Sequence, residues 1–401
     1  MIKKLNRNLI ILTSTLPRWK DDETPQFILD HALLLAPYFR EVVIIAPHSR
    51  GAKRYEEVQK NVVIKRIRYF IPTSQQNIFY SGGATEHVSL SPLYLLKLAL
   101  YLMSLFYNVI KLRPGKDTVI NANWVIPQGF VAVLVKTFYR KVPIITTARG
   151  TDIFTLNSKL VTKIKELVLK QSDKVIVNSH LLKTACSKIY KRDYTVQPTG
   201  YDNTVFKRSN KRSKQQHKTL QLISVGRLVE VKGFYDILSA VKILKKGNID
   251  VYLKIVGSGP EENGMREYVV KNGLSHMVEF TGWLSAKRLS SLYLEADLYV
   301  GASKRAASGS VESFGNVYLE AMACGTPIIV STLAGAAEII THGENGFIIQ
   351  PEMPSEIAEI IRALCLNRPM LTEMGERAAN TAQQYSKKAA RDKYLEIINE
   401  L

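Results

Sequence analysis

Short apolar segments rich in β-branched residues alternate with longer amphipathic segments along the whole chain. Segments such as 9–12 and 42–46 contain no polar residue, which is typical of strands buried on both faces of a sheet. Helical patterns lie between the strands, for example at Gln26–Ala36 and Gly129–Tyr139. This alternation predicts a mostly parallel sheet with helices on both faces. The strands expected in the first half are Leu9–Leu12, Val42–Ala46, Val62–Ile67, Thr118–Ala122, Ile144–Ala148 and Lys174–Val177.

The same alternation restarts after residue 218, which predicts a second α/β domain. We expect a first domain over 1–202, a basic linker over 203–219 and a second domain over 220–385. A last helix over 386–401 follows, and packing back on the first domain is one option for it. The expected strands are Leu220–Val225, Val251–Val256, Val278–Phe280, Leu298–Gly301 and Pro327–Val330, and the expected helices are Phe234–Lys245, Pro260–Asn272, Ala286–Glu295 and Asn316–Ala323.

Charge is distributed unevenly between the two halves. Of the net charge of +20, residues 1–202 carry +16, from 30 Lys and Arg against 14 Asp and Glu. This excess favours an anionic partner such as a phosphate-bearing substrate, an acidic membrane face or a nucleic acid, and a surface tuned for solubility is the alternative. The three cysteines are widely spaced and form neither a metal-ligand nor a disulfide pattern, which favours a reducing cytoplasm.

Two segments bear on membrane association. The N-terminal run Leu9–Leu12 is too short for a signal peptide, and no stretch reaches the ~20 apolar residues of a spanning helix. Ser91 and Pro92 begin a helix over 91–113, which is either a core helix or an interfacial one, with the core helix favoured from the segment alone. The helix Ser158–Gln171 is amphipathic and basic. We therefore expect a peripheral protein at the inner face of the cytoplasmic membrane.

The segment 312–327 is the most informative part of the chain. Glu312 precedes a loop that enters a helix, and Glu320 lies about two turns along that helix. A helix N-terminus offers free N–H groups to a phosphorylated or hydroxyl-rich ligand, and two carboxylates at different levels could grip one extended ligand. Taken alone, the segment is better interpreted as an ordinary capped surface helix with two solvated glutamates.

Two further loops follow predicted strands. Gly226 ends one strand, and two cations five residues apart, Arg227 and Lys232, follow it. Gly257 begins a Gly-Ser-Gly-Pro loop after the next strand. Ligands of open α/β sheets bind beyond the carboxyl ends of the strands, so these cations are candidates for holding a diphosphate. Plain polar turns are the alternative for each loop.

Together these motifs resemble the family 4 retaining glycosyltransferases. The resemblance rests on Gly-Arg-Leu-x₃-Lys-Gly at 226–233, Val-Gly-Ser-Gly-Pro at 256–260, Phe-Thr-Gly at 280–282 and Glu-Ser-Phe-Gly-x₄-Glu-Ala-x-Ala-Cys-Gly-Thr-Pro at 312–327. It continues through 335–340 and 345–347, and so spans nearly the entire second half. It implies the GT-B arrangement, in which two Rossmann-like domains face each other across a cleft.

The resemblance also implies roles for individual residues. Arg227 and Lys232 would hold the donor diphosphate, Glu312 would contact hydroxyls of the transferred sugar, and Glu320 would bind the ribose. The remaining donor-binding positions implied are Gly226, Gly257, Gly282, Trp283, Leu284, Ser313, Phe314, Gly315, Asn316 and Val317, with 282–284 near the base and the backbone of 314–316 near the sugar.

The first half departs from the family pattern. Asn121, Asn123 and Arg149 stand where the family often carries histidine. Arg149 cannot act as a base, since the pKa of arginine lies above about 12. It would either stabilise charge on the departing phosphate or pair with Asp152 to hold its loop, and the sequence favours neither role.

The expected reaction is transfer from a nucleoside diphosphate sugar, with UDP favoured over GDP, to a glycan or lipid-linked glycan in cell-surface polysaccharide synthesis such as lipopolysaccharide or capsule. No Asp-x-Asp triplet or metal-ligand spacing occurs, so we expect no metal and no further cofactor. Retention is expected to follow a same-face mechanism. The alternatives are a GT-B epimerase or phosphorylase, and a non-catalytic binder. A nucleic-acid binder ranks last because no motif supports it.

Overall fold

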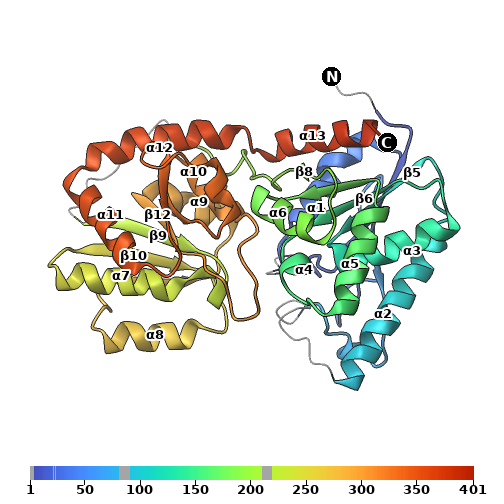
Figure 1. Cartoon of the computed structure of the whole chain (residues 1–401), viewed down its shortest axis with the longest axis horizontal. Helices are drawn as coiled ribbons and strands as arrows, with labels where there is room; N and C mark the ends of the chain where they lie inside the picture. The colour runs from blue at the N-terminus through green and yellow to red at the C-terminus, as the bar shows by residue number, and fades with distance from the viewer. Residues whose placement is uncertain (1–3, 21, 23, 81–90, 210–218) are drawn as a thin grey trace. The chain divides into compact units, whose positions relative to one another are not determined.

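The computed structural model describes residues 4–20, 22, 24–80, 91–209 and 219–401 (Figure 1). The chain divides into two compact units, each with its own sheet. The first unit comprises the described residues up to 178 together with 182–197 and 391–401, and the second comprises 179–181 and the described residues of 198–390. Most of the predicted linker, 210–218, lies outside the described residues. Phe206, which the sequence assigns to this linker, is buried against Tyr293 in the second unit, with ring centroids 6.0 Å apart.

The first unit contains an eight-stranded sheet among its described residues, in the order β3-β4-β2-β1-β5-β6-β7-β8. All neighbouring strands are parallel except β3 and β4. The strands are β1 (Asn8–Leu12), β2 (Val42–Pro47), β3 (Tyr55–Gln59), β4 (Val62–Ile67), β5 (Thr118–Asn123), β6 (Ile144–Ala148), β7 (Lys174–Val177) and β8 (Thr195–Val196). The six predicted strands are confirmed. The sequence missed β3 because that edge strand is polar and mostly exposed, so it lacks a buried run.

Helices cover this sheet, and two core clusters fill the space between sheet and helices. Four apolar or aromatic residues near the C-terminus, Tyr394, Leu395, Ile397 and Ile398, are buried in the same cluster as Leu9 and Ile11 of β1. Figure 1 accordingly shows the end of the last helix beside the N-terminal segments. The helices are α1 (Phe27–Leu35), α2 (Pro92–Ile110), α3 (Phe130–Phe138), α4 (Thr151–Phe154), α5 (Lys159–Gln171), α6 (His180–Ile189) and the C-terminal α13 (Lys387–Asn399).

Helix α2 differs from the expectation for its segment. It begins as predicted, since the Ser91 hydroxyl accepts a hydrogen bond from the Tyr94 amide at 3.3 Å. However, it runs unbroken for 19 residues and is long and apolar enough to cross a bilayer by length and composition. The prediction that no segment meets this length was wrong, because Lys97 and Asn108 interrupt the apolar run without interrupting the helix.

The second unit contains a six-stranded sheet among its described residues, in the order β11-β10-β9-β12-β13-β14, with every pair parallel. The five predicted strands are confirmed within two residues at each end, and β14 adds to them. The elements are β9 (Leu220–Val225), α7 (Phe234–Lys246), β10 (Val251–Val256), α8 (Glu262–Lys271), β11 (Val278–Gly282), α9 (Ala286–Glu295), β12 (Leu298–Gly301), α10 (Asn316–Ala323), β13 (Ile328–Ser331), β14 (Gly346–Ile349), α11 (Pro354–Leu366) and α12 (Arg368–Gln383).

Candidate functional site

Three loops meet at the carboxyl edge of the second sheet. The Gly226 amide after β9 donates to the carbonyl of Val256 at 3.0 Å, and the Gly257 amide after β10 donates to the carbonyl of Gly282 at 2.9 Å. The Leu228 amide also donates to the carbonyl of Ser258 at 2.9 Å. Because these bonds tie consecutive strand ends together, the loops form one surface where ligands of such sheets bind.

The glycines of these loops are required by close backbone contact. Gly257 has φ of +132°, and a Cβ built there would lie 2.0 Å from the carbonyl oxygen of Gly226. A Cβ on Gly226 would lie 3.1 Å from Cε of Lys232. Side chains at these positions would therefore push the loops apart and displace the lysine.

Lys232 and Glu312 form an ion pair on this surface. Lys232 ends a short 3-10 turn after β9, while Glu312 lies in the loop before α10. Their side chains are 19% and 15% exposed, so both are largely shielded from water yet reachable. The loop of Glu312 is fixed by its backbone, because its carbonyl accepts from the Gly335 amide at 3.2 Å. Arg227, the second predicted cation, is exposed to solvent.

The first turn of α10 lies next to this pair. Gly315 precedes the helix with φ of +90°, and no side chain caps the helix start. A Cβ on Gly315 would stand 3.4 Å from Cγ of Glu312, which places the carboxylate arm beside the entry of the helix. The free amides and the dipole of such a turn favour an anionic or hydroxyl-rich ligand.

Glu320 is half-buried and lies near two cations. Burial raises the pKa of its carboxyl to about 7, and the rise is opposed by Lys387, by the neighbouring Tyr293 and by Lys232. Lys232 thus acts electrostatically on both predicted carboxylates. Tyr293 and Lys387 were missed by the sequence analysis, because neither stands near the motif in the chain.

The other predicted donor-site residues differ in what they can offer. Phe314 is 2% exposed and packs in the core, and its carbonyl accepts from the Ala336 amide at 3.1 Å, so its ring is not available to a ligand. Trp283 is 51% exposed beside Gly282, whose φ is +71°. The half-buried residues are Leu284, Ser313, Asn316 and Val317.

In the first unit, Asp152 holds its own loop. Its carboxylate accepts hydrogen bonds from the amides of Val125 at 2.6 Å, Gly150 at 2.9 Å and Arg149 at 3.1 Å. Burial raises the pKa of Asp152 against the opposing effect of these amides. Asp152 is 2% exposed, so its geometry is that of a residue that fixes the backbone after β6.

Arg149 belongs to a network of hydrogen-bonded side chains at the ends of β5 and β6. Its guanidinium donates to Asn123 and lies 5.0 Å from the ring centre of Phe27. Burial lowers the pKa of Arg149 to about 10, which leaves it charged at neutral pH. Asn123 donates to Asn121 at 2.7 Å, and Asn121 donates to the hydroxyl of Tyr394 from α13.

His31 contacts the Tyr394 end of this side-chain network. Its ring stands edge-on to Tyr394 with centroids 4.7 Å apart, and burial and Arg149 lower its pKa to about 3. His31 is therefore neutral at physiological pH. His31 and Tyr394 could not be identified from the sequence, because they belong to α1 and α13, which are far from Arg149 along the polypeptide.

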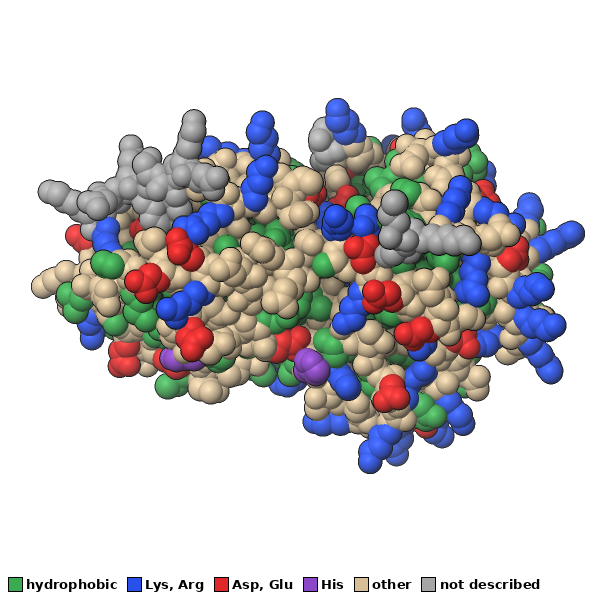
Figure 2. Space-filling view, turned by 90° about the horizontal axis from the view of Figure 1, so that it is seen from above, with side chains coloured by type: hydrophobic (Ala, Val, Ile, Leu, Met, Phe, Trp, Pro, Cys, Tyr) green, Lys and Arg blue, Asp and Glu red, His purple; other side chains and the backbone are tan. Residues whose placement is uncertain are grey.

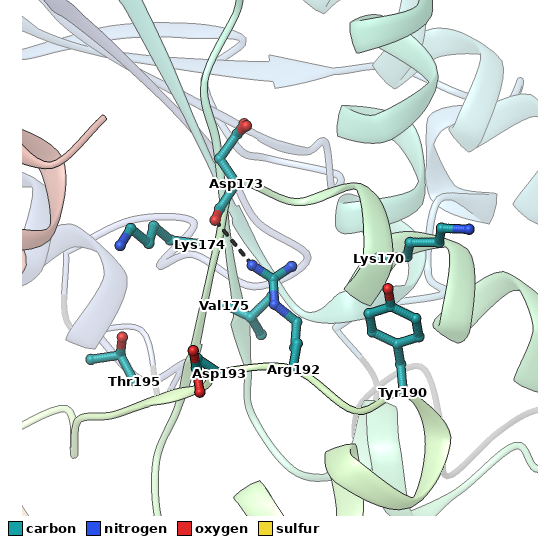
Figure 3. A pocket seen from close by; sticks show the side chains of 8 residues that line it. All are labelled: Lys170, Asp173, Lys174, Val175, Tyr190, Arg192, Asp193 and Thr195. Atoms are coloured by element: carbon teal, nitrogen blue, oxygen red, sulfur yellow. Dashed lines mark hydrogen bonds between the residues drawn. The ribbon is translucent and has the colours of Figure 1, made fainter.

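A separate surface pocket of the first unit is a poor candidate. Three of its charged groups are already engaged: Lys174 pairs with Glu400 at 2.6 Å, Asp173 pairs with Lys136 at 2.6 Å, and Arg192 donates to the carbonyls of Ser172 and Asp173. Figure 3 shows Lys170 pointing away from these groups. Among the described residues, no group of three or more His, Cys, Asp and Glu is placed to hold a metal ion.

Comparison with known proteins points to one enzyme class. Residues 205–381, which belong to the second unit, match the family model described as Glycosyl transferases group 1. The N-acetyl-alpha-D-glucosaminyl L-malate synthase of Bacillus anthracis is 28% identical over 277 residues, covering 66% of this chain and 70% of that protein. The lipopolysaccharide core biosynthesis glycosyltransferase LpsE of Rhizobium meliloti is 31% identical over 178 residues, covering 44% and 49%.

Solved structures share the fold. Sucrose-phosphate synthase from Thermosynechococcus elongatus superimposes with a TM-score of 0.79 at 16% identity, covering 98% of this chain and 99% of that one. Anabaena Alr3699/HepE in complex with UDP gives a TM-score of 0.73 at 19% identity, covering 98% and 100%. The predicted fold class of two Rossmann-like α/β units, as in GT-B glycosyltransferases, is confirmed.

Proposed function

We propose that this chain transfers a sugar from a nucleoside diphosphate sugar to a glycan acceptor, with the donor bound at the carboxyl edge of the second sheet. The observation that carries the proposal is the ion pair of Lys232 and Glu312 on the surface where the loops after β9, β10 and β11 meet. The match of residues 205–381 to a glycosyltransferase model supports it.

The charges of the site suit a departing diphosphate. Breaking the bond between the sugar and the phosphate leaves negative charge on the phosphate oxygen, and fixed cations lower the cost of that charge. Lys232 is held in place by Glu312 before any ligand arrives, and Arg227 is exposed and able to reach a phosphate. Cations and the first turn of α10 would then do what a metal does elsewhere, so we propose metal-independent transfer.

Glu312 and Glu320 would hold the hydroxyl-rich ends of the donor. Glu312 stands beside the start of α10 and would accept from hydroxyls of the sugar, while Glu320 would accept from the ribose. Trp283 is exposed at the end of β11 and offers an aromatic face to the base. The UDP complex of the fold relative HepE supports UDP as the nucleotide.

The proposed reaction retains the configuration of the sugar. The bond between the anomeric carbon and the phosphate oxygen breaks, and the acceptor oxygen bonds to the same face of that carbon. The departing phosphate oxygen takes the proton of the acceptor hydroxyl, so charge and atoms balance without a protein nucleophile.

We further propose that the acceptor is a lipid-linked glycan of cell-surface polysaccharide synthesis, such as lipopolysaccharide or capsule, as the name of the relative LpsE suggests. Such an acceptor would place the enzyme peripherally at the inner face of the cytoplasmic membrane.

The test is release of nucleoside diphosphate from UDP-glucose, UDP-N-acetylglucosamine and GDP-mannose, with and without a lipid extract from the source cells. We expect acceptor-dependent release from one donor, loss of release in Lys232→Ala, and a product with the donor's anomeric configuration. Release that is independent of the extract would instead indicate a hydrolase, and an inverted product would exclude the same-face reaction.

A further inference from the structure

Helix α2 presents an apolar side to solvent. Leu96, Met103 and Tyr107 are 51%, 59% and 62% exposed, and their spacing of seven and four residues places them on one side of the helix. Leu93 in the first turn is 49% exposed. Phe138 at the end of α3 is 69% exposed and lies 5.7 Å from the ring of Phe106 in α2. We call Leu93, Leu96, Met103, Tyr107 and Phe138 the α2 apolar face.

The opposite side of α2 anchors the helix in the first unit. Tyr101, Leu105 and Val109 are fully buried, and Tyr101 packs against Phe79 with ring centroids 4.5 Å apart. Lys97, the sole charged residue of the helix, is 6% exposed and donates to Gln75 at 2.9 Å. A helix held in this way lies along the surface of its domain, so it cannot cross a bilayer without unpacking the core.

Exposed cations flank the α2 apolar face. Lys111 and Arg113 follow α2 directly, and Arg140 and Lys141 follow α3. The two helix ends are adjacent, because the hydroxyl of Tyr139 donates to the carbonyl of Ile110 at 3.4 Å. None of these four cations forms an ion pair with a residue that the structure describes.

We propose that the α2 apolar face and its flanking cations dock the chain on an anionic lipid bilayer, with α2 lying in the interface. Apolar side chains with lysine and arginine at their border are the pattern of interfacial helices, in which the apolar side chains enter the acyl boundary and the cations meet anionic headgroups.

Charge complementarity distinguishes this partner from a second copy of the chain. A symmetric dimer through the α2 apolar face would bring two sets of the same cations together without acidic partners. The wider charge distribution agrees with an anionic bilayer, because residues 1–202 carry +16 of the net charge of +20. Figure 2, which views the molecule from above, shows lysine and arginine side chains over the first unit on that face.

The proposal deepens the lipid-linked acceptor of the proposed function, but vesicle binding is measured without substrate. Sugar transfer and membrane docking can therefore fail separately.

The test is flotation of the full chain with vesicles of phosphatidylcholine alone or mixed with phosphatidylglycerol. We expect binding to the mixed vesicles at low salt and weaker binding at high salt. The double variant Leu96→Gln/Met103→Gln should lower the vesicle affinity at least tenfold. The matched control Val270→Gln/Leu366→Gln replaces two side chains of the second unit that are 70% and 87% exposed, and it should bind as the wild type does.

The variant Lys111→Gln/Arg113→Gln should lose most of the preference for phosphatidylglycerol. Thermal unfolding reports whether each variant is folded. Absence of wild-type binding to the mixed vesicles at low salt, or equal binding by the Leu96→Gln/Met103→Gln variant, would overturn the proposal. A wild-type dimer that this variant converts to a monomer would assign the face to a second copy and would also overturn it.

Discussion

Lys232 and Glu312 are 80 residues apart in the chain and form an ion pair at the carboxyl edge of the second sheet. The pair joins two motifs that are individually ordinary. Neither a lysine in a polar loop nor a glutamate before a helix identifies a ligand site by itself. Their contact beside the start of α10 brings a cation, a carboxylate and free amides together in one site.

Glu312→Gln should separate binding of the sugar from binding of the nucleotide. If Glu312 accepts from hydroxyls of the sugar, the variant loses at least about tenfold in affinity for UDP-glucose, since a hydrogen bond to a charged group contributes about 1.5–3 kcal/mol and about 1.4 kcal/mol corresponds to a factor of ten. Affinity for UDP should change much less. Calorimetric titration of both ligands measures the ratio, and an equal loss for the two would show that Glu312 does not act on the sugar.

Glu320 should make the stability of the protein depend on pH. Because burial raises its folded pKa to about 7 from 4.5, ionisation is harder in the folded state. Glu320 contributes most to the free energy of unfolding below about pH 4.5, and this contribution is lost as the pH rises toward 7. Urea unfolding at pH 5 and pH 8 should show that Glu320→Gln becomes more stable relative to the wild type at pH 8, by about 1–3 kcal/mol. A difference that is the same at both pH values would mean that Glu320 titrates normally.

Gly257→Ala should disturb the loops far more than Gly282→Ala. Both positions have positive φ, but a Cβ at 257 meets the carbonyl of Gly226 at 2.0 Å, whereas a Cβ at 282 meets nothing within 4 Å. The free energy of unfolding of the Gly282 variant should fall by about 1 kcal/mol because of backbone strain alone. We expect a larger loss and weakened UDP binding for the Gly257 variant, measured by urea unfolding and calorimetry. Similar losses in the two variants would rule out the close contact of the loops.

Asp152→Asn should weaken the first unit. Asn offers one acceptor oxygen, so either the Val125 amide or the amides of Arg149 and Gly150 would face an NH₂ donor instead. An unsatisfied buried amide costs about 1–3 kcal/mol, which thermal and urea unfolding can detect. UDP binding by the second unit should remain. Unchanged stability with lost activity would instead return Asp152 to a direct role in the reaction.

The strands and the donor motif could be predicted from the sequence because they depend on local pattern. Buried parallel strands such as β2 are continuous apolar runs, and the helix after Gly315 begins where the motif predicts. The edge strand β3 could not be predicted, because its residues are polar and exposed.

Contacts between segments that are distant along the polypeptide could not be predicted from the sequence either. The role of Asp152 depends on amides from two loops. The side-chain network that links Arg149 to Tyr394 depends on how α13 packs. The exposed side of α2 could not be read from its composition, since an apolar helix gives no periodic signal for the side that is buried.

A donor site at Lys232 and Glu312 is tested most directly by calorimetric titration of UDP, GDP and ADP into the wild type, Lys232→Ala and the control Lys254→Ala. Lys254 also pairs with a glutamate of the second unit, Glu295 at 3.5 Å, but lies within β10 rather than in a loop of the site. We expect that one diphosphate binds the wild type and the control alike and binds Lys232→Ala at least tenfold more weakly. Binding that Lys232→Ala leaves unchanged, or no binding of any of the three, would contradict a donor site at this pair.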